Sequence, residues 1–455
     1  MQKTKEIQAD FLTAVSAFLR VQGKNKCMLE SIPRDKSQGR YTIIAWSPVK
    51  EITVKEKTFT VSGVGSYQID DPLKELEKQI LVSETPIKGL PFQGGAIGYV
   101  GYDVIGSYEE LGPIPHDETG LPDIHFYLFD SFLLFDHLKE TILLVEADSY
   151  SQRTEAELEQ ALTQTAEQLR TPVPEEQKVI ELNPLDYRSN FSKHQFEETV
   201  KKIKRYIAEG DMFQMVPSQR LSADCTDNPF DYYRRLRVEN PSSYLYFLDF
   251  TDTYVVGSSP ERLVSVKNQT VTTNPIAGTR KRGATPEEDN RLAKELLADE
   301  KERAEHLMLI DLGRNDIGKI SEIGSVEVPL YMTIEKYRFV MHIVSVVTGK
   351  LKKNCTAMDA LKATLPAGTV SGAPKIRAMQ RIYELEPVKR GIYAGAVGYL
   401  SKDDQADFAI AIRTMVIHQK KAYVQAGAGI VYDSDPKKEY EETLQKAKAL
   451  LEVGQ

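Results

Sequence analysis

The stretch FYLFDSFLLFDHLKETILLVEA, residues 126–147, is rich in β-branched and aromatic side chains and divides into pieces of strand length. The segment RYTIIAWSPVKEITV, residues 40–54, has the same character. Between them, FQGGAIGYVGYD, residues 92–103, carries closely spaced glycines of the kind found where backbones pack against each other. These segments predict that residues 1–170 form mainly strands, joined by few helices.

The second half of the chain alternates between helical and strand patterns. A helix is predicted between Ser192, which can cap its start, and Gly210, which can end it. Its buried face consists of four apolar residues at helical spacing: Phe196, Val200, Ile203 and Ile207. Four stretches are predicted to be strands, at residues 213–222, 242–250, 254–266 and 269–279. Three further helices are expected. They lie at 229–238, from the capping pattern at 285–288 to about 312, and from 435–436 onward. The class is mixed α/β, with large sheets covered by helices.

Length and composition restrict the kinds of protein this can be. At 455 residues the chain is too long for one ordinary core, so we expect two domains or one large layered unit built from two halves. The proline-rich, charged segment 171–187 is the predicted linker between a region at 1–170 and a region at 188–455. No apolar run approaches the ~18 residues of a membrane span, and the N-terminus has no secretory pattern.

Charge and cysteine content point to a protein that handles a small molecule in the cytoplasm. The formal net charge of −8 argues against a nucleic-acid partner. Three isolated cysteines, Cys27, Cys225 and Cys355, argue for a reducing compartment and against a disulfide framework or a cysteine-based zinc site.

Two pairs of glutamates stand three residues apart in predicted helices. Glu302 and Glu305 share one helix face, and Glu439 and Glu442 share another, with Lys446 four residues further on. Such pairs are either solvated helix faces or a set of hard oxygen ligands for Mg²⁺, and the spacing leaves both interpretations open. His306, next to the first pair, is similarly either a packed histidine or a ligand.

Glycines elsewhere allow bare backbone to approach an anion. The stretch NPIAGTRKRG, residues 274–283, places Ala277 between a proline and two glycines, and QAGAGIV, residues 425–431, contains Gly427 and Gly429. The second motif lacks the third glycine of a dinucleotide fingerprint, but its backbone N–H groups can still contact an anionic ligand. The stretch GRNDIGKI, residues 313–320, has the spacing of a phosphate loop but has isoleucine in place of the required Ser or Thr.

Seven ordered blocks resemble the chorismate-utilising enzymes, and most closely the branch formed by the synthase subunits of anthranilate synthases. They are PIAGTRKRG, DEKERAEHLMLIDLGRND, VMHIVSVVTG, PAGTVSGAPKIRAM, IAIRTM, QAGAGIV and DPKKEYEETLQKAKAL. The resemblance is specific from about residue 190 to 450 and weaker before it. It implies a layered α/β/β/α sandwich built from two intertwined halves, with the active site in the C-terminal region.

The resemblance also implies roles for individual residues. Glu305 and Glu442 match Mg²⁺ ligands, with Glu302 and Glu439 beside them, and the ion would hold the ring carboxylate of chorismate. Substrate contacts are implied for Tyr393 and Arg413 at the enolpyruvyl carboxylate, for the backbone at Gly278, Thr279, Gly427 and Gly429, for Lys446, and for the hydroxyl of Thr369. Glu261 matches the general acid that protonates the departing C4 hydroxyl. His342 matches a histidine near the ring, which either assists proton removal from C2 or only orients its neighbours.

Two positions indicate which nucleophile attacks the ring. Gln214 stands where isochorismate and salicylate synthases carry a water-activating lysine, and its amide has no basic lone pair at neutral pH. Ala277 stands where many aminodeoxychorismate synthases carry a lysine that attacks the ring covalently. The resemblance therefore implies ammonia as the nucleophile, with anthranilate and pyruvate as products in the first committed step of tryptophan biosynthesis. Aminodeoxychorismate synthase is the alternative within the family, because some of its members also carry alanine there.

The resemblance further implies regulation and a partner. Tryptophan would bind as a feedback inhibitor between Ser31, in Leu29-Glu30-Ser31, and an opposite wall formed by Asn240, Pro241, Tyr244 and Leu245. The wall departs from the family pattern at Ser243 and Leu245, and a simple hydrophobic contact between the two halves is the other interpretation. A separate glutamine amidotransferase subunit would supply ammonia, giving a hetero-oligomer. A non-catalytic amino-acid-sensing subunit is the rival from another class.

Overall fold

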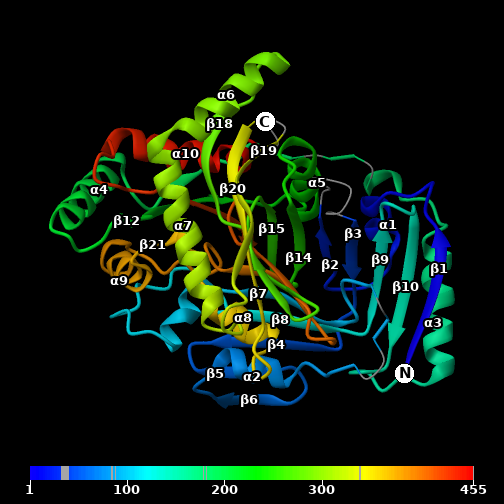
Figure 1. Ribbon diagram of the computed structural model, residues 1–455. Coiled ribbons are helices and arrows are strands. Elements are labelled where there is room, and N and C mark those ends of the chain that lie inside the picture. Colours follow the sequence, from blue (N-terminus) through cyan, green and yellow to red (C-terminus); the bar gives the residue numbers. More distant parts are fainter. Residues whose placement is uncertain are drawn as a thin grey trace.

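Strands from both halves of the chain join edge to edge in two large sheets of the computed structural model, which describes residues 1–31, 40–83, 86–87, 89–177, 179–180, 182–337 and 340–453 (Figure 1). Within these residues, the eleven-stranded sheet runs in the order β1 (Gln2–Gln8), β10 (Thr141–Ala147), β9 (Ser131–Asp136), β3 (Tyr41–Ala45), β2 (Cys27–Glu30), β14 (Tyr244–Asp249), β15 (Thr253–Ser259), β24 (Thr414–His418), β25 (Lys421–Gly427), β13 (Ser218–Asp224) and β11 (Arg188–Ser189).

The twelve-stranded sheet also contains strands from both halves of the chain. Its described strands run in the order β18 (Ile276–Lys281), β20 (Val340–Lys350), β17 (Thr270–Thr273), β16 (Arg262–Lys267), β23 (Ala406–Ile410), β22 (Ala396–Ser401), β7 (Gly95–Val100), β8 (Ile124–Phe129), β4 (Lys50–Lys55), β5 (Thr58–Val61) and β6 (Gly65–Gln68), while β19 (Glu327–Lys336) pairs with β20. The halves meet where Glu30 pairs with Leu245 in one sheet and Gly98 with Gly398 in the other. The predicted intertwining of two halves is confirmed; the domain boundaries at 171–187 stay a prediction.

Helices cover the outer faces of both sheets, and the inner faces pack against each other. The helices and 3-10 turns are α1 (Ala14–Arg20), α2 (Pro72–Lys78), η1 (Tyr102–Ser107), α3 (Glu155–Gln168), η2 (Glu175–Gln177), α4 (Lys193–Ala208), α5 (Pro229–Glu239), α6 (Pro286–Ala298), α7 (Glu300–Gly318), α8 (Ala357–Thr364), η3 (Gly368–Val370), α9 (Lys375–Leu385) and α10 (Pro436–Leu451). None of those described is long and apolar enough to cross a membrane.

Three apolar clusters correspond to the interfaces between these layers. Tyr99 and Phe129 of the larger sheet pack with Phe132 and Leu248 of the smaller sheet in the central cluster. A second cluster joins the smaller sheet to α1, α3, α5 and α10, and a third joins the larger sheet to α2, α7, α8 and α9. This arrangement is the predicted α/β/β/α sandwich.

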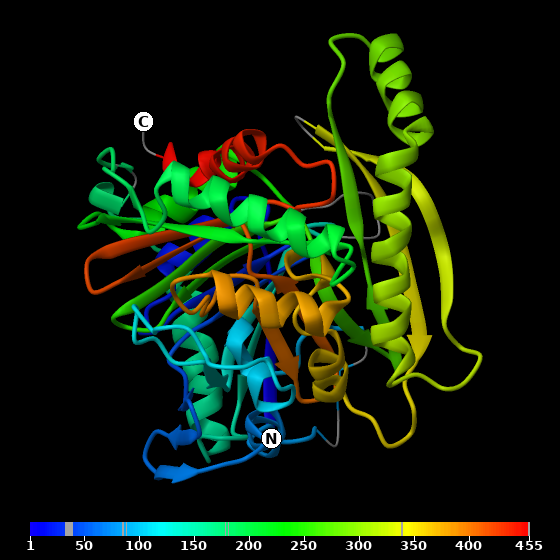
Figure 2. The ribbon, with the colours of Figure 1, turned by 90° about the vertical axis from the view of Figure 1, so that its left-hand side faces the viewer.

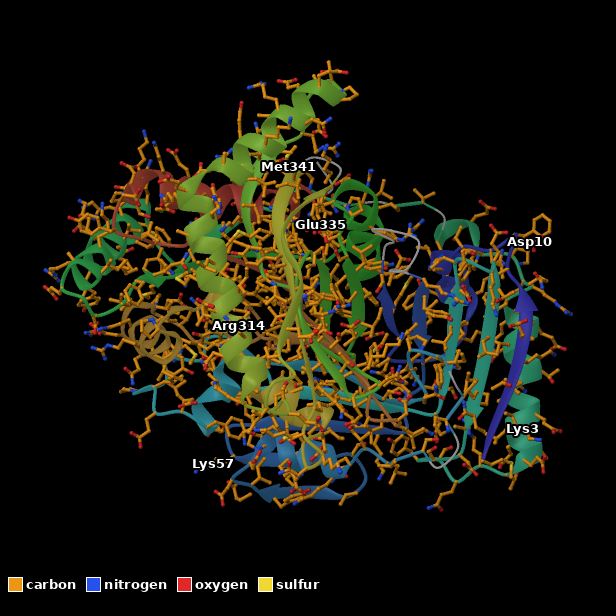
Figure 3. All side chains as sticks on the ribbon, viewed as in Figure 1. Lys3, Asp10, Lys57, Arg314, Glu335 and Met341 are labelled. Atoms are coloured by element: carbon orange, nitrogen blue, oxygen red, sulfur yellow. The ribbon has the colours of Figure 1, made fainter. Side chains whose placement is uncertain are left out.

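The helix predicted from residue 286 to about 312 is two helices, and that prediction was wrong. α6 ends at Ala298 and α7 begins at Glu300, because the Asp299 side chain accepts hydrogen bonds from the backbone N–H groups of Lys301 and Glu302. Figure 2 shows α6 and α7 end to end beside β18 and β20, forming an arm that rises beyond the rest of the molecule. In Figure 3, the labelled Arg314 on α7 lies toward the opposite end of this arm from Glu335 and Met341 on β19 and β20.

Candidate functional site

The Gln214 amide lies between the glycine turn after β25 and helix α7. Gln214 is in the two-residue strand β12 (Gln214–Met215), which pairs with β21 (Gly372–Ala373), and its side chain is buried. Its Nε2 donates to Glu305 Oε1 at 2.9 Å. A methyl group added to Gly429 would lie 2.7 Å from the same nitrogen, so glycine is required there if the amide is to keep this place. The predicted residues Gln214, Glu305 and Gly429 therefore come together.

A bulge in β18 brings a backbone carbonyl to the His342 ring. The pairing of β18 with β20 shifts register between Ala277 and Thr279, and Gly278 at the shift has a φ of 68°. His342 Nδ1 lies 2.8 Å from the Gly278 carbonyl oxygen. A carbonyl oxygen can only accept, so Nδ1 carries the proton and the neutral ring has its basic lone pair at Nε2. This tautomer is the one a proton-accepting histidine needs if Nε2 faces the substrate.

Gly278 also lies against the first glutamate pair. A methyl group added there would lie 3.0 Å from Glu302 Oε2, and the Thr279 hydroxyl is 3.1 Å from His342 Nδ1. Position 278 thus needs glycine for two reasons, a left-handed backbone and a carboxylate that approaches it closely.

Tyr393, Gly427 and Lys446 form a second group of predicted residues. The Tyr393 hydroxyl lies close to the Gly427 backbone, since a methyl group added to this glycine would be 3.0 Å from it. Lys446 Nζ donates to the Gly427 carbonyl at 3.2 Å. Burial raises the pKa of Tyr393 to about 12, although the Arg390 charge opposes the rise. The phenol therefore stays protonated at neutral pH and can donate to a carboxylate.

Glu261 and Thr369 line one cavity next to α7. Glu261 is buried, while the Thr369 hydroxyl is buried with no hydrogen-bond partner among the described residues. Burial lowers the pKa of Arg413, and the charges of Tyr337 and Glu261 oppose that shift, which puts Glu261 within electrostatic reach of the guanidinium. Arg413 has a φ of 48°, a strained value for a residue with a side chain.

The two glutamate pairs lie at the start of α7 and on α10. The hydrogen bond with Asp433 raises the pKa of Lys301, and the charges of Glu305 and Glu439 add to this rise. One acid from each helix is therefore within electrostatic reach of the same lysine. Glu442 pairs with Lys446 at 2.8 Å, and Glu302 pairs with Arg280 at 3.2 Å. Within the described residues, no three His, Cys, Asp or Glu side chains are gathered closely enough to hold a metal ion. Glu302 and Glu305 are near each other, and so are Glu439 and Glu442, but the four described carboxylates are not assembled into a ligand cluster.

His306, the ambiguous neighbour of Glu305, is packed rather than exposed. Its side chain is fully buried, its Nε2 lies 2.7 Å from the Ser345 hydroxyl, and burial lowers its pKa to about 4. It points into the core between α7 and β20 and not toward the acidic pairs, which favours the structural interpretation.

The residues expected to bind an inhibitor lie where β2 meets β14. Glu30 pairs with Leu245, so Ser31 follows directly at the end of β2, opposite the start of β14. The Tyr244 hydroxyl donates to Asp407 at 2.9 Å and accepts from Arg262, the residue after Glu261. The Asn240 carbonyl accepts from the Ser258 hydroxyl, and its side-chain Nδ2 is buried with no partner in the described residues. Pro241 is half-buried beside it.

Several residues around the site were not among the predicted ones. Tyr337 packs its ring edge-on against His342 at 5.3 Å between centroids. Arg390 and Glu386 form a buried ion pair below Tyr393. The sequence carries a weak signal for this pair, since a Glu and an Arg are four residues apart in ELEPVKRGIY, but Pro387 rules out a helix that would join them.

Comparisons with known proteins agree with the fold and with the motifs. The model of the chorismate binding enzyme family matches residues 25–452. The chain is 56% identical to anthranilate synthase component 1 of Lactococcus lactis over 100% of both chains. It is 46% identical to anthranilate synthase component 1 of Aquifex aeolicus, covering 98% of this chain and 93% of that protein.

Solved structures of this family have the same fold as this chain. Anthranilate synthase component I from Streptococcus pneumoniae superposes with a TM-score of 0.86 at 54% identity, covering 98% of this chain and 99% of that one. A menaquinone-specific isochorismate synthase from Escherichia coli superposes with a TM-score of 0.75 at 21% identity, covering 100% and 95% of the chains, and shows the shared fold alone.

Proposed function

The chain belongs to the family of chorismate binding enzymes, and on that premise we propose that it is the synthase component of an anthranilate synthase. It converts chorismate and ammonia to anthranilate and pyruvate, the first committed step of tryptophan biosynthesis. The observation that carries this proposal is the buried Gln214 amide, hydrogen-bonded to Glu305 at 2.9 Å in the position where a water-activating base would stand. An amide cannot take a proton from water at neutral pH, so ammonia, which needs no activation, is the favoured nucleophile.

The substrate's two carboxylates would be bound by separate groups. The protonated Tyr393 hydroxyl and the Arg413 guanidinium hold the enolpyruvyl carboxylate, assisted by backbone at Gly427 and by Lys446. The partly buried position of Arg413 strengthens its attraction for an anion, because little water competes with the ligand. Glu261, within electrostatic reach of Arg413, protonates the departing C4 hydroxyl, and Thr369 offers the substrate a hydroxyl that has no partner in the described part of the chain.

Proton removal from C2 completes the aromatic ring when pyruvate leaves. We assign this step to His342, whose Nδ1 proton is held by the Gly278 carbonyl and whose Nε2 is therefore the basic atom. Ala277, one residue before Gly278, has no nucleophilic group, so no covalent intermediate forms with this residue and the ring carbon stays open to ammonia.

Enzymes of this family generally depend on Mg²⁺, and the acids of this chain match that ion in donor chemistry, although the described carboxylates are not gathered around one point. Glu302, Glu305, Glu439 and Glu442 are hard oxygen donors, and their mutual repulsion is of the kind that a divalent cation relieves. Burial, with the charges of Glu305 and Glu442 respectively, raises the pKa of Glu302 and of Glu439. Bound Mg²⁺ would neutralise the ring carboxylate and hold it in place.

Magnesium binding is expected to strengthen as the pH rises from mildly acidic to neutral. Only ionised carboxylates bind the cation, and the raised pKa values of Glu302 and Glu439 mean that protons compete in this range. In the metal-free chain these two acids add stability below their ordinary pKa of 4.5, and this is lost as the pH rises through the raised values. Titration calorimetry at several pH values should show tighter binding with proton release; a pH-independent affinity would contradict the assignment.

Gly429→Ala is expected to lower kcat/KM by about 10²-fold, because displacing one positioned group by about 1 Å is enough for such a loss. The added methyl group would meet Gln214 Nε2 at 2.7 Å and push the amide away from Glu305. Gly318→Ala in α7, where an added methyl group meets none of the described residues within 4 Å, is the matched control and should leave turnover unchanged. Equal kinetics for the two variants would show that the amide's place does not matter.

We also propose that tryptophan binds between Ser31 and the segment at Asn240, Pro241, Tyr244 and Leu245, and inhibits turnover. Tyr244 bonds Arg262, which is next to Glu261, so a ligand at this wall is close to the catalytic groups. Ser31→Leu should raise the tryptophan concentration needed for half-inhibition by at least about 10-fold, a usual size for coupling between sites. The KM for chorismate should stay the same; a parallel rise in both quantities would place Ser31 in the substrate site instead.

The designation component 1 in the relatives' names implies a second component. We propose that this is a glutamine amidotransferase subunit, which supplies ammonia in a cytoplasmic hetero-oligomer. The purified chain alone should therefore use ammonium but not glutamine.

The function is tested by incubating the purified chain with chorismate, Mg²⁺ and ammonium. Anthranilate fluorescence should appear, and omission of either chorismate or ammonium should abolish it. A product that becomes aromatic only after a separate lyase is added would identify an aminodeoxychorismate synthase. No consumption of chorismate under any condition would favour a sensing subunit without chemistry.

A further inference from the structure

A buried ion pair lies directly below the candidate site. Arg390 Nη2 donates to Glu386 Oε1 at 2.6 Å and Arg390 Nε to Glu386 Oε2 at 2.9 Å. The two side chains are 1% and 3% exposed. Taking two charges out of water costs several kcal/mol each, and an apolar pair of the same volume is often as stable. The fold alone therefore gives no strong reason for this pair.

The same guanidinium holds two backbone segments that carry site residues. Arg390 Nη2 donates to the Val216 carbonyl at 2.6 Å, and Nη1 donates to the Val370 carbonyl at 2.7 Å. Val216 is two residues after Gln214, and Val370 follows Thr369. With the two bonds to Glu386, four of the five N–H groups of the guanidinium are engaged. Arg390 therefore directs all but one of its donors to protein acceptors.

The third contact of Arg390 is with the loop that carries Tyr393. The guanidinium carbon lies 5.5 Å from the centre of the Tyr393 ring and 4.6 Å from that of Tyr102. Glu386 extends the network on the other side, because its Oε1 also accepts from the Ser218 backbone N–H at 2.8 Å and from the Ser218 hydroxyl at 2.9 Å. One ion pair thus touches the β12–β13 connection, η3 and the Tyr393 loop, which are far apart in sequence.

We propose that Arg390, held by Glu386, is a positioning residue that fixes Gln214, Thr369 and Tyr393 relative to one another. The planar guanidinium is suited to this role, because its fork sends bonds in several fixed directions, whereas a lysine ammonium is a single flexible point. The inference rests on the proposed function only in that these three residues are taken to surround the reacting substrate.

Arg390→Lys tests the proposal, because it keeps the charge and the bond to Glu386 but cannot reach both carbonyls in the same geometry. We expect chorismate consumption per enzyme to fall by about 10²-fold, the size of loss that a misplacement of about 1 Å causes. Arg153→Lys is the matched control. Arg153 also pairs with a buried glutamate, Glu146 at 2.7 Å, and donates to a backbone carbonyl, but it lies in the N-terminal region away from the site.

The two lysine variants separate positioning from stability. Both should lower Tm, because each disturbs a buried pair, but only Arg390→Lys should lower kcat at a temperature where both are folded. Equal kcat in the two variants would overturn the proposal. Wild-type enzyme measured beside them tests the proposed function separately. The readout is chorismate consumption, so it stays valid if the product is not anthranilate.

Chemical rescue provides a second measurement. Arg390, Gly391 and Tyr393 line a cavity, so the side-chain volume removed by Arg390→Ala would adjoin it and leave a space that a guanidinium ion can enter. Millimolar guanidinium should restore part of the lost kcat, whereas methylammonium should not. A rise in Tm without any rise in kcat would show that Arg390 supports only the fold. If the alanine variant does not fold, the comparison of the lysine variants decides the question.

Discussion

Glu261→Gln is expected to lower kcat by about 10³-fold, within the range usual for loss of a general acid. Glutamine has nearly the same shape but cannot give a proton to the C4 hydroxyl as it leaves. Glu261 is buried in the cavity that also contains Thr369, so water cannot easily take its place. Steady-state kinetics with saturating ammonium and Mg²⁺ measure the effect, and KM for chorismate should change little.

The control for this variant is Glu287→Gln, an exposed acid in the first turn of α6. It removes one negative charge from the same chain without touching the cavity, and its kcat should match that of the wild type. If Glu261→Gln retained kcat within about 10-fold, too small a loss for a general acid, another group would have to protonate the leaving hydroxyl.

Glu442→Gln is expected to lower kcat/KM by about 10²-fold or more and to raise the Mg²⁺ concentration needed for half-maximal activity. The amide keeps one oxygen but loses the charge that attracts the cation. It also ends the 2.8 Å ion pair with Lys446, a residue assigned to the substrate carboxylates. Activity measured across a series of Mg²⁺ concentrations separates the loss of metal affinity from the loss of turnover.

Glu441, the residue directly before Glu442, supplies a close control. Glu441 is exposed on the same helix and lies 4.0 Å from Lys437. Glu441→Gln removes the same charge one residue away, on a different face of α10, and should leave the Mg²⁺ dependence unchanged. Identical Mg²⁺ curves for the wild type, Glu441→Gln and Glu442→Gln would mean that α10 does not bind the metal.

Local signals in the sequence predicted individual helices well where capping chemistry was clear. Ser192 caps α4 and Asp435 caps α10, both as expected. The break at Asp299 was missed, because an aspartate within a long charged helical pattern does not interrupt its periodicity. The available signal was the spacing of Asp299 and Glu302, which resembles a capping box and could have been read as a second helix start.

The candidate site shows where local reasoning stops. The i, i+3 spacing of Glu302 and Glu305 correctly placed them on one helix face, and the glycines correctly indicated close backbone approach. The meeting of Gln214 with Glu305 joins residues 91 apart in the chain, and no local pattern encodes that distance. It was anticipated only through the resemblance to a family.

The Arg390 network was not anticipated at all. Its partners are two backbone carbonyls, Val216 and Val370, and any residue type would present the same acceptors at those positions. The four-residue spacing of Glu386 and Arg390 is only a weak signal for their pairing, and Pro387 argues against the helix that would join them. Such contacts are visible only once the two halves and both sheets are assembled.

The central claim is that ammonia, and not water, adds to the ring of chorismate in a site that holds Gln214 in place of a base. Mass spectrometry of the product formed from chorismate, Mg²⁺ and ¹⁵N-labelled ammonium in ¹⁸O-labelled water tests it directly. We expect anthranilate that carries the heavy nitrogen and no heavy oxygen from the solvent. A hydroxylated product with solvent oxygen and without nitrogen would contradict it.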